Sequence, residues 1–317
     1  MRRALLGGLV SFGATYAAAP LVRRALVRRG ALDIPNHRSS HTEPVPRGGG
    51  IACLIGVAAG IAATGRQSAI PPRTMLAVAA LAATGLADDR LGHVSPITRL
   101  AIQGSAGLAM SPDLALAALS PVGTAGVVNV VNFMDGINGI TGSTAAVWGA
   151  STLIAGRRQL DPTLQTLGAV TAGAGLGFIP WNAPKADLFL GDVGSYLFGG
   201  LCAAGITHAW GRGSRQGWLV AAPLLPYAVD ASQALVRRAW RGAPLPEAHR
   251  EHIYQRLVDE QGLSHVQSAT LHALSAAVTS FSSRQPGWCG AATTAAALAL
   301  YISSPSWLRA LRRRDAQ

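Results

Sequence analysis

Two adjacent carboxylates, Asp88 and Asp89, end an apolar segment that begins near Leu76. Acids at the edge of such a segment are costly unless a cation or another partner offsets their charge. The alternative interpretation is an ordinary acidic loop that starts with Asp-Asp-Arg. Because residues 76–87 are otherwise apolar, we favour a functional pair.

A second polar cluster ends a later apolar segment and contains Asn129, Asn132, Asp135 and Asn138. A spacing of three residues places side chains on one face of a helix, and the intervening glycines break that helix and admit a ligand. Amide and carboxylate groups that converge at a lipid boundary suit a hard cation or a nucleobase. A simple helix cap needs only one such residue, so we favour a functional cluster.

Asp192 begins another apolar segment within Gly191-Asp-Val-Gly-Ser195, and Asn182 lies ten residues earlier. Asp is a common helix cap, which is one interpretation of this position. A helix N-terminus also suits an anion held through Mg²⁺. The local sequence favours neither interpretation.

Two polar loops carry arginine and histidine together. In the loop 33–50, Arg38, His41 and Arg47 could meet phosphate, or they could belong to a solvated basic loop. In the loop after residue 240, His249 and His252 share a helical face, with Arg250 between them. No third ligand completes a zinc site, so we favour a phosphate-binding patch over a metal site or an interfacial helix.

The elements that must position these groups are apolar helices. Only 13% of the 317 residues are charged, against roughly 25% in soluble domains. Apolar blocks of about the length of a bilayer span recur along the chain. We expect an all-α, polytopic transmembrane bundle, one domain over residues 1–317, with about eleven spans: 4–22, 49–65, 73–87, 97–110, 113–129, 139–155, 163–180, 193–209, 216–234, 265–281 and 287–304.

Charge predicts the orientation of these spans. An N-terminus on the periplasmic side and a C-terminus in the cytoplasm place 18 of the 27 Lys and Arg inside, as the positive-inside rule favours. The same arrangement places 13 of the 15 Asp and Glu at the cytoplasmic side, which the rule does not require. We therefore expect a multi-pass protein of the bacterial inner membrane with a site that faces the cytoplasm.

The net charge of +12 also raises the alternative of a nucleic-acid partner. The arginines flank apolar blocks and do not form one basic face, so we expect a lipid bilayer and no nucleic acid as partner. A transporter is a second alternative, since polar residues in broken helices mark that class as well. A transporter would carry acids near the bilayer midplane and symmetry between its halves, and we see neither.

The ordered set of these segments resembles the polyprenyl-phosphate N-acetylhexosamine-1-phosphate transferases, which are glycosyl transferases of family 4. The resemblance runs from about residue 33 to residue 256 and rests on five short motifs in order. It implies transfer of a sugar-1-phosphate from a UDP-sugar to undecaprenyl phosphate, with release of UMP. It also implies Mg²⁺ as cofactor, with Mn²⁺ as an alternative, and a homodimer is compatible with it.

The resemblance implies a role for each motif. Asn132 and Asp192 would be the protein ligands of Mg²⁺, and Asp88 and Asp89 would orient or deprotonate the lipid phosphate. Asp135 would support the nucleotide pocket. The remaining positions would bind substrate, Asn138 and Asn182 through the uracil and the loop residues through the diphosphate or the sugar: Arg38, His41, His249, Arg250 and His252.

One departure from the family narrows the prediction. The sequence His249-Arg250-Glu-His252 is not the run of three histidines typical of the phospho-MurNAc-pentapeptide transferases of peptidoglycan synthesis. We therefore expect the branch that starts surface polysaccharides such as the O-antigen and keep the peptidoglycan enzyme as the alternative. The loop 237–262 is where we expect the donor sugar to be distinguished.

Overall fold

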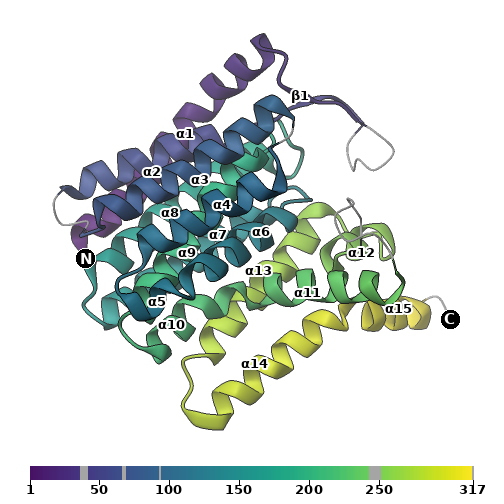
Figure 1. The fold of residues 1–317 in the computed structure, drawn as a ribbon. Helices are drawn as coiled ribbons and strands as arrows, with labels where there is room; N and C mark the ends of the chain where they lie inside the picture. Colours follow the sequence, from purple (N-terminus) through teal and green to yellow (C-terminus); the bar gives the residue numbers. More distant parts are fainter. Residues whose placement is uncertain (36–41, 66–68, 93, 243–250, 316–317) are drawn as a thin grey trace.

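The computed structural model describes residues 1–35, 42–65, 69–92, 94–242 and 251–315. Over these residues the chain is a bundle of α-helices with one pair of two-residue strands (Figure 1). The helices are α1 Arg2–Arg28, α2 Gly50–Thr64, α3 Pro72–Leu91, α4 Pro96–Met110, α5 Leu114–Ala117, α6 Ser120–Phe133, α7 Ile140–Arg158, α8 Pro162–Asn182, α9 Gly191–Trp210, α10 Ser214–Ala221, α11 Leu225–Trp240, α12 Ile253–Asp259, α13 His265–Ser282, α14 Gly287–Ile302 and α15 Ser304–Asp315.

The all-α prediction is confirmed, and each predicted span overlaps a helix. Two spans are interrupted. The fifth divides into α5 and α6, and the ninth divides into α10, the 3₁₀ turn η2 (Ala222–Leu224) and α11. Pro223 and Pro226 account for the second break, because proline offers no backbone N–H to the preceding turn. The short helices α12 and α15 were not predicted.

The surface and the interior are distributed as expected for a bundle in lipid. Large apolar side chains are exposed, among them Leu9 at 70%, Leu76 at 71% and Ile97 at 80%. Polar side chains such as Ser11 and Gln103 are fully buried. Among the described residues, the segments Arg2–Arg28 and Ser214–Trp240 are long and apolar enough to cross a bilayer. The count of eleven crossings and their orientation stay predictions.

Glycines set how closely α9 approaches its neighbours. A Cβ on Gly50 of α2 would collide with the backbone of Gly194, and a Cβ on Gly85 of α3 would collide with the carbonyl of Asp192. Both helices therefore pack directly on the first turn of α9. Small residues at such contacts are typical of helix packing in membranes.

The two strands lie at one end of the bundle. β1 (Leu32–Asp33) pairs antiparallel with β2 (Val45–Pro46), and Arg47 after β2 forms a bridge to Phe189, just before α9. We call this end the hairpin end (Figure 1). The opposite end holds the N-terminus and the start of α10 (Figure 1).

Candidate active site

Asp89 and the first turn of α9 form the centre of the hairpin end. The amide of Asp192 donates to Asp89 Oδ1 at 2.9 Å, and the amide of Val193 donates to Asp89 Oδ2 at 3.0 Å. Asp89 thus caps α9 from a different helix and satisfies two amides that have no partner within α9. Its side chain is only 3% exposed. We expected Asp89 to act on the lipid phosphate, and in this arrangement its oxygens hold α9 in place.

Arg47 lies between the two carboxylates. Its Nε is 2.9 Å from Asp89 Oδ1, and its Nη2 donates to Asp192 Oδ1 at 3.0 Å. Burial acts to lower the pKa of the Arg47 guanidinium, but the charges of Asp192 and Asp89 outweigh burial and the pKa lies above its ordinary value. Arg47 is therefore a permanent cation within the acidic cluster. It is 43% exposed, so one side of the guanidinium still faces solvent.

Asp88 is held by a different set of partners. It accepts the amide of Val94 at 2.7 Å and Nη1 of Arg99 at 3.0 Å. Arg99 is brought there by the start of α4, where Ser95 caps the helix through the amide of Thr98 at 3.1 Å. The adjacent acids Asp88 and Asp89 consequently have separate roles in the fold, although both open onto one pocket.

Asn132 and Asp192 meet, as the predicted ligand pair requires. Asn132 Nδ2 donates to Asp192 Oδ1 at 3.0 Å and to Ser195 Oγ at 3.0 Å. One residue ends α6 and the other begins α9, so the pair joins two helices. Rotation of the Asn132 amide would turn its oxygen toward Asp192.

This donor set fits Mg²⁺ when the ion arrives with substrate. Carboxylate and amide oxygens are suitable hard ligands, and Mg²⁺ usually keeps several waters and takes further oxygens from phosphates. The described residues contain no cage of three or more His, Cys, Asp or Glu. The site offers two protein ligands, and oxygens of a diphosphate would complete the coordination of the ion.

Asp135 lies in the loop between α6 and α7 and is partly buried. Burial raises its pKa to about 7, with further contributions from the charges of Asp192 and Asp89. A hydrogen bond from Thr141 and the charge of Arg47 act in the opposite direction. Asp135 can therefore carry a proton near neutral pH, and its expected role in the nucleotide pocket stays a prediction.

The two asparagines expected to contact uracil lie near each other. They differ in how far their side chains are already used in hydrogen bonds within the protein. Asn182 accepts the amide of Gly139 at 2.6 Å and donates to the carbonyl of Leu188 at 3.1 Å, so both ends of its buried amide hold loops together. Asn138 donates to the carbonyl of Pro184 at 3.1 Å and lines a pocket. Asn138 is thus better placed to reach a ligand than Asn182.

Two pockets open at this end. One has a volume of about 370 Å³ and is lined by Arg47, Asp88, Asp89, Arg99 and Asp192. The other has a volume of about 440 Å³, and its polar lining includes Arg23, Asn138, Lys185 and His265. The first pocket combines three acids with two arginines, and the second combines Glu43 and Asp187 with Arg23, Lys185 and His265.

His252 is buried beneath this surface. Its Nδ1 is 3.1 Å from Asp230 Oδ1, and its side chain is 6% exposed. Asp230 also accepts the amide of Ile253 at 2.8 Å and the hydroxyl of Tyr301 at 2.9 Å. Asp230 therefore ties α11, α12 and α14 together. The expected contact of His252 with substrate stays a prediction, while Arg38, His41, His249 and Arg250 lie outside the described residues.

Sequence reasoning noticed Arg47 as a phosphate-binding candidate and missed that it pairs with acids. Neither Arg99 nor the pairing of Asp230 with His252 was predicted. The helix start Ser95-Pro96 was a visible signal that Arg99 lies one turn into a helix directly after Asp88. The role of Arg47 had no comparable local signal, because its partners come from residues far along the chain.

A protein-family model matches residues 108–209, and its description is glycosyl transferase family 4. The matched region begins near the end of α4 and ends in α9. It contains Asn132, Asp135, Asn138, Asn182 and Asp192. It therefore covers the pair that meets at the α6–α9 junction but not Asp88, Asp89 or His252.

Several curated proteins are similar over most of the chain. Decaprenyl-phosphate N-acetylglucosaminephosphotransferase of Mycolicibacterium smegmatis is 28% identical over 86% of this chain and 79% of its own length. A probable undecaprenyl-phosphate N-acetylglucosaminyl 1-phosphate transferase of Bacillus subtilis is 26% identical over 84% of this chain and 80% of its own.

A peptidoglycan enzyme matches only locally. Phospho-N-acetylmuramoyl-pentapeptide-transferase of Mycobacterium ulcerans is 50% identical over 44 residues, which is 14% of this chain. The long matches are thus to N-acetylglucosamine phosphotransferases, and they set the transporter alternative aside in favour of an enzyme. Residues 108–209 thus match glycosyl transferase family 4, and most of the chain is similar to enzymes named as polyprenyl-phosphate N-acetylglucosamine phosphotransferases.

Proposed function

We propose that this enzyme transfers an N-acetylhexosamine-1-phosphate from a UDP-sugar to undecaprenyl phosphate, in a Mg²⁺-dependent reaction that starts a cell-surface polysaccharide. The carrying observation is the arrangement of Asp88, Asp89 and Asp192 with Arg47 and Arg99 around one pocket. A cluster of both signs suits the approach of two phosphate-bearing substrates, whose main barrier is mutual repulsion.

The lipid substrate has a path to this pocket. An apolar groove of about 640 Å³ runs between α3 and α4, from Ile97 and Thr98 near the pocket to Arg73 and Ala109 at the opposite end. An isoprenoid tail can lie in such a groove with its phosphate near Asp88 and Arg99. Arg99 would attract the phosphate, and Asp88 would hold Arg99 in position.

The nucleotide would occupy the second pocket, which Asn138 lines. Asn138 can hydrogen-bond a uracil, and Lys185 and Arg23 supply positive charge for a diphosphate. Asp135, with its pKa near 7, would donate or accept a hydrogen bond near the nucleotide. Figure 1 places the loops after α6 and before α9 at this same end of the bundle.

The proposed reaction is a single phosphoryl transfer. An oxygen of the lipid phosphate bonds to the β-phosphorus of the UDP-sugar, and the bond between that phosphorus and the UMP oxygen breaks. The products are polyprenyl-diphosphate sugar and UMP. Mg²⁺ held by Asn132 and Asp192 would neutralise diphosphate charge when bound. Arg47 would keep Asp192 and Asp89 at a fixed separation.

A carboxylate in this site is needed to position the lipid phosphate more than to remove a proton from it. The second pKa of a phosphate monoester is about 6, so the nucleophile is largely ionised at neutral pH. Asp88→Asn and Asp89→Asn should therefore lose activity at every pH tested. Full recovery of either variant at raised pH would show instead that the missing carboxylate acts as a base.

The decisive assay uses membranes that contain the full chain, undecaprenyl phosphate and labelled UDP-N-acetylglucosamine. We expect a lipid-linked product with Mg²⁺, none with EDTA, and recovery when Mg²⁺ or Mn²⁺ is restored. Membranes with Asp192→Asn serve as the matched control. A panel of UDP-N-acetylhexosamines and UDP-MurNAc-pentapeptide identifies the donor. No metal-dependent product with any donor would overturn the proposal.

The proposed location is the bacterial inner membrane, with the hairpin end in the cytoplasm where UDP-sugars are made. The orientation rests on the excess of arginine predicted at that side. Cysteine labelling from outside the cell can test it, with reporters placed at exposed Arg215 and exposed Lys185. Labelling at position 185 but not at 215 in intact cells would overturn the orientation.

A further inference from the structure

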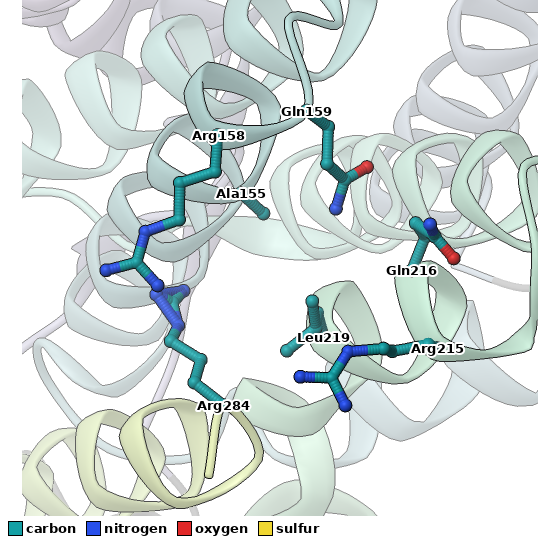
Figure 2. A pocket seen from close by; sticks show the side chains of 7 residues that line it. All are labelled: Ala155, Arg158, Gln159, Arg215, Gln216, Leu219 and Arg284. Atoms are coloured by element: carbon teal, nitrogen blue, oxygen red, sulfur yellow. The ribbon is translucent and has the colours of Figure 1, made fainter. Parts of the chain in front are cut away.

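A pocket of about 220 Å³ at the opposite end of the bundle is lined by three arginines, Arg158, Arg215 and Arg284. They come from the end of α7, the start of α10 and the turn after α13. Figure 2 shows Arg158 and Arg284 with neighbouring guanidinium groups, while Arg215 reaches toward the same space from the other side. Gln159 and Gln216 complete the polar lining.

Among the described residues, no carboxylate lines this pocket to balance the three charges. The two acids at this end have other partners: Asp161 pairs with Arg212 at 3.0 Å and His208 at 2.9 Å, and Asp113 caps α5 through the amide of Leu116 at 2.9 Å. Across the described part of the chain, Arg158 and Arg215 make no hydrogen bond or ion pair. Like charges held around one cavity repel each other and favour an anion between them.

Arg284 is fixed in this position by the protein. Its Nη2 donates to Ser151 O at 3.1 Å and to Ser151 Oγ at 2.8 Å, while its Nε is buried without a hydrogen-bond partner. Burial first, and then the nearby Arg158, lower the pKa of Arg284. The fold thus holds a cation where its surroundings disfavour one, which a bound anion would offset.

The surroundings of the pocket match a lipid rather than a free ion. Ile154, one turn before Arg158, is 45% exposed, and Phe281, just before Arg284, is 68% exposed. Trp218 on α10 and Trp288 at the start of α14 are 54% and 80% exposed. Exposed tryptophans mark the level of lipid headgroups, and the exposed apolar side chains offer a surface for acyl chains.

We infer that the pocket formed by Arg158, Arg215 and Arg284 binds the phosphate of an anionic phospholipid headgroup. Basic pockets between membrane helices are suited to such headgroups. This site lies at the far end from the acidic pocket, so it is separate from the proposed transfer reaction and does not depend on it.

The test uses the purified full chain in a neutral detergent, titrated with phosphatidylglycerol, with phosphatidylcholine of the same acyl chains, and with inorganic phosphate. Native mass spectrometry measures retained lipid, and thermal unfolding measures stabilisation. Arg158→Gln with Arg215→Gln removes two exposed cations from the pocket. Arg3→Gln with Arg157→Gln is the matched control, because it removes two exposed arginines at the same end that do not line the pocket.

We expect the wild type and the control to retain phosphatidylglycerol over phosphatidylcholine, and the pocket variant to retain roughly tenfold less. Equal retention by the pocket variant and the control would overturn the inference. Stabilisation by inorganic phosphate, with no preference between the two lipids, would overturn the lipid as the occupant. Transferase activity should be the same in all three proteins, which separates this outcome from any failure of the proposed function.

Discussion

The two ends of this bundle differ in how their acids and arginines are paired. At the hairpin end, Asp88, Asp89 and Asp192 each have an arginine at about hydrogen-bond distance, Arg99 for the first and Arg47 for the other two. At the opposite end, Asp161 is held by Arg212 and His208, and three further arginines share a pocket without an acid. The cluster of acids and arginines at the hairpin end is nearly balanced, and the arginine cluster at the opposite end carries excess positive charge.

This difference indicates what each end can bind. A balanced cluster gains little from a lone cation or a lone anion, because either one disturbs existing pairs. It gains from both together, as when Mg²⁺ arrives with a diphosphate. An unbalanced cluster of arginines gains from an anion alone. The contrast is therefore between a site for a metal–substrate complex and a site for a simple anionic group.

The largest effect on activity should appear when one acid at each end is replaced, in separate variants, by asparagine. Asp192→Asn removes a proposed metal ligand and an Arg47 partner, so we expect transferase activity to fall roughly 10²- to 10³-fold. Asp161→Asn should lower the melting temperature but leave activity per folded molecule near that of the wild type. Equal loss of activity in the two variants, measured in the lipid-product assay, would remove the contrast between the ends.

The next largest effect concerns Arg47. Arg47→Gln leaves Asp89 and Asp192 facing each other without their shared cation, and we expect activity to fall roughly tenfold and stability by about 1–2 kcal/mol. Arg47→Lys keeps the charge but loses the fork of donors, so it should be intermediate. Arg212→Gln is the comparison at the opposite end, where His208 stays on the same oxygen of Asp161.

A smaller effect should appear in the pH dependence of stability without Mg²⁺. The folded-state pKa of Asp135, about 7, lies above its unfolded value of about 3.9, so the folded chain binds this proton more tightly. Its stabilising contribution is complete below about pH 4 and is lost as pH rises through about 7. Asp135→Asn lacks this titration. Its stability relative to the wild type should therefore rise by about 2–3 kcal/mol between about pH 5 and about pH 8.

Thermal unfolding of both proteins in EDTA at the two pH values checks this expectation. Asp113→Asn at the opposite end is the control, and its difference from the wild type should be the same at both values. A difference for Asp135→Asn that does not change with pH would show that Asp135 is ionised throughout.

The smallest effect concerns an exposed pair at the hairpin end. Lys185 Nζ is 3.0 Å from Glu43 Oε2, with side-chain exposures of 81% and 71%. Such a pair contributes about 0–1 kcal/mol, so neither Lys185→Gln nor Glu43→Gln should move the melting temperature appreciably. Only Lys185→Gln should raise KM for the UDP-sugar, by a few-fold, because it removes a cation from the proposed nucleotide pocket. A matching rise for Glu43→Gln would assign the effect to the pair.

The sequence was sufficient for the helices and for part of the site. Apolar block lengths predicted each main helix, and the family resemblance implied that Asn132 and Asp192 belong together. The pairing of Arg47 with Asp89 and Asp192 was not predictable, because it depends on the β1–β2 hairpin and on a bridge to Phe189. The cap that Asp89 provides to α9 was missed for the same reason. Local propensity carries no information about partners about 100 residues apart.

The cap on α9 can form only late in the biosynthesis of the enzyme. Asp89 is synthesised and inserted long before the amides of Asp192 and Val193 exist, and the first turn of α9 has no capping side chain of its own. The acidic pocket therefore has to be completed after insertion of α9, when the ribosome has passed the middle of the chain. In a chain truncated before α9, Asp89 would keep Arg47 as a partner but would lack the two amides that it caps.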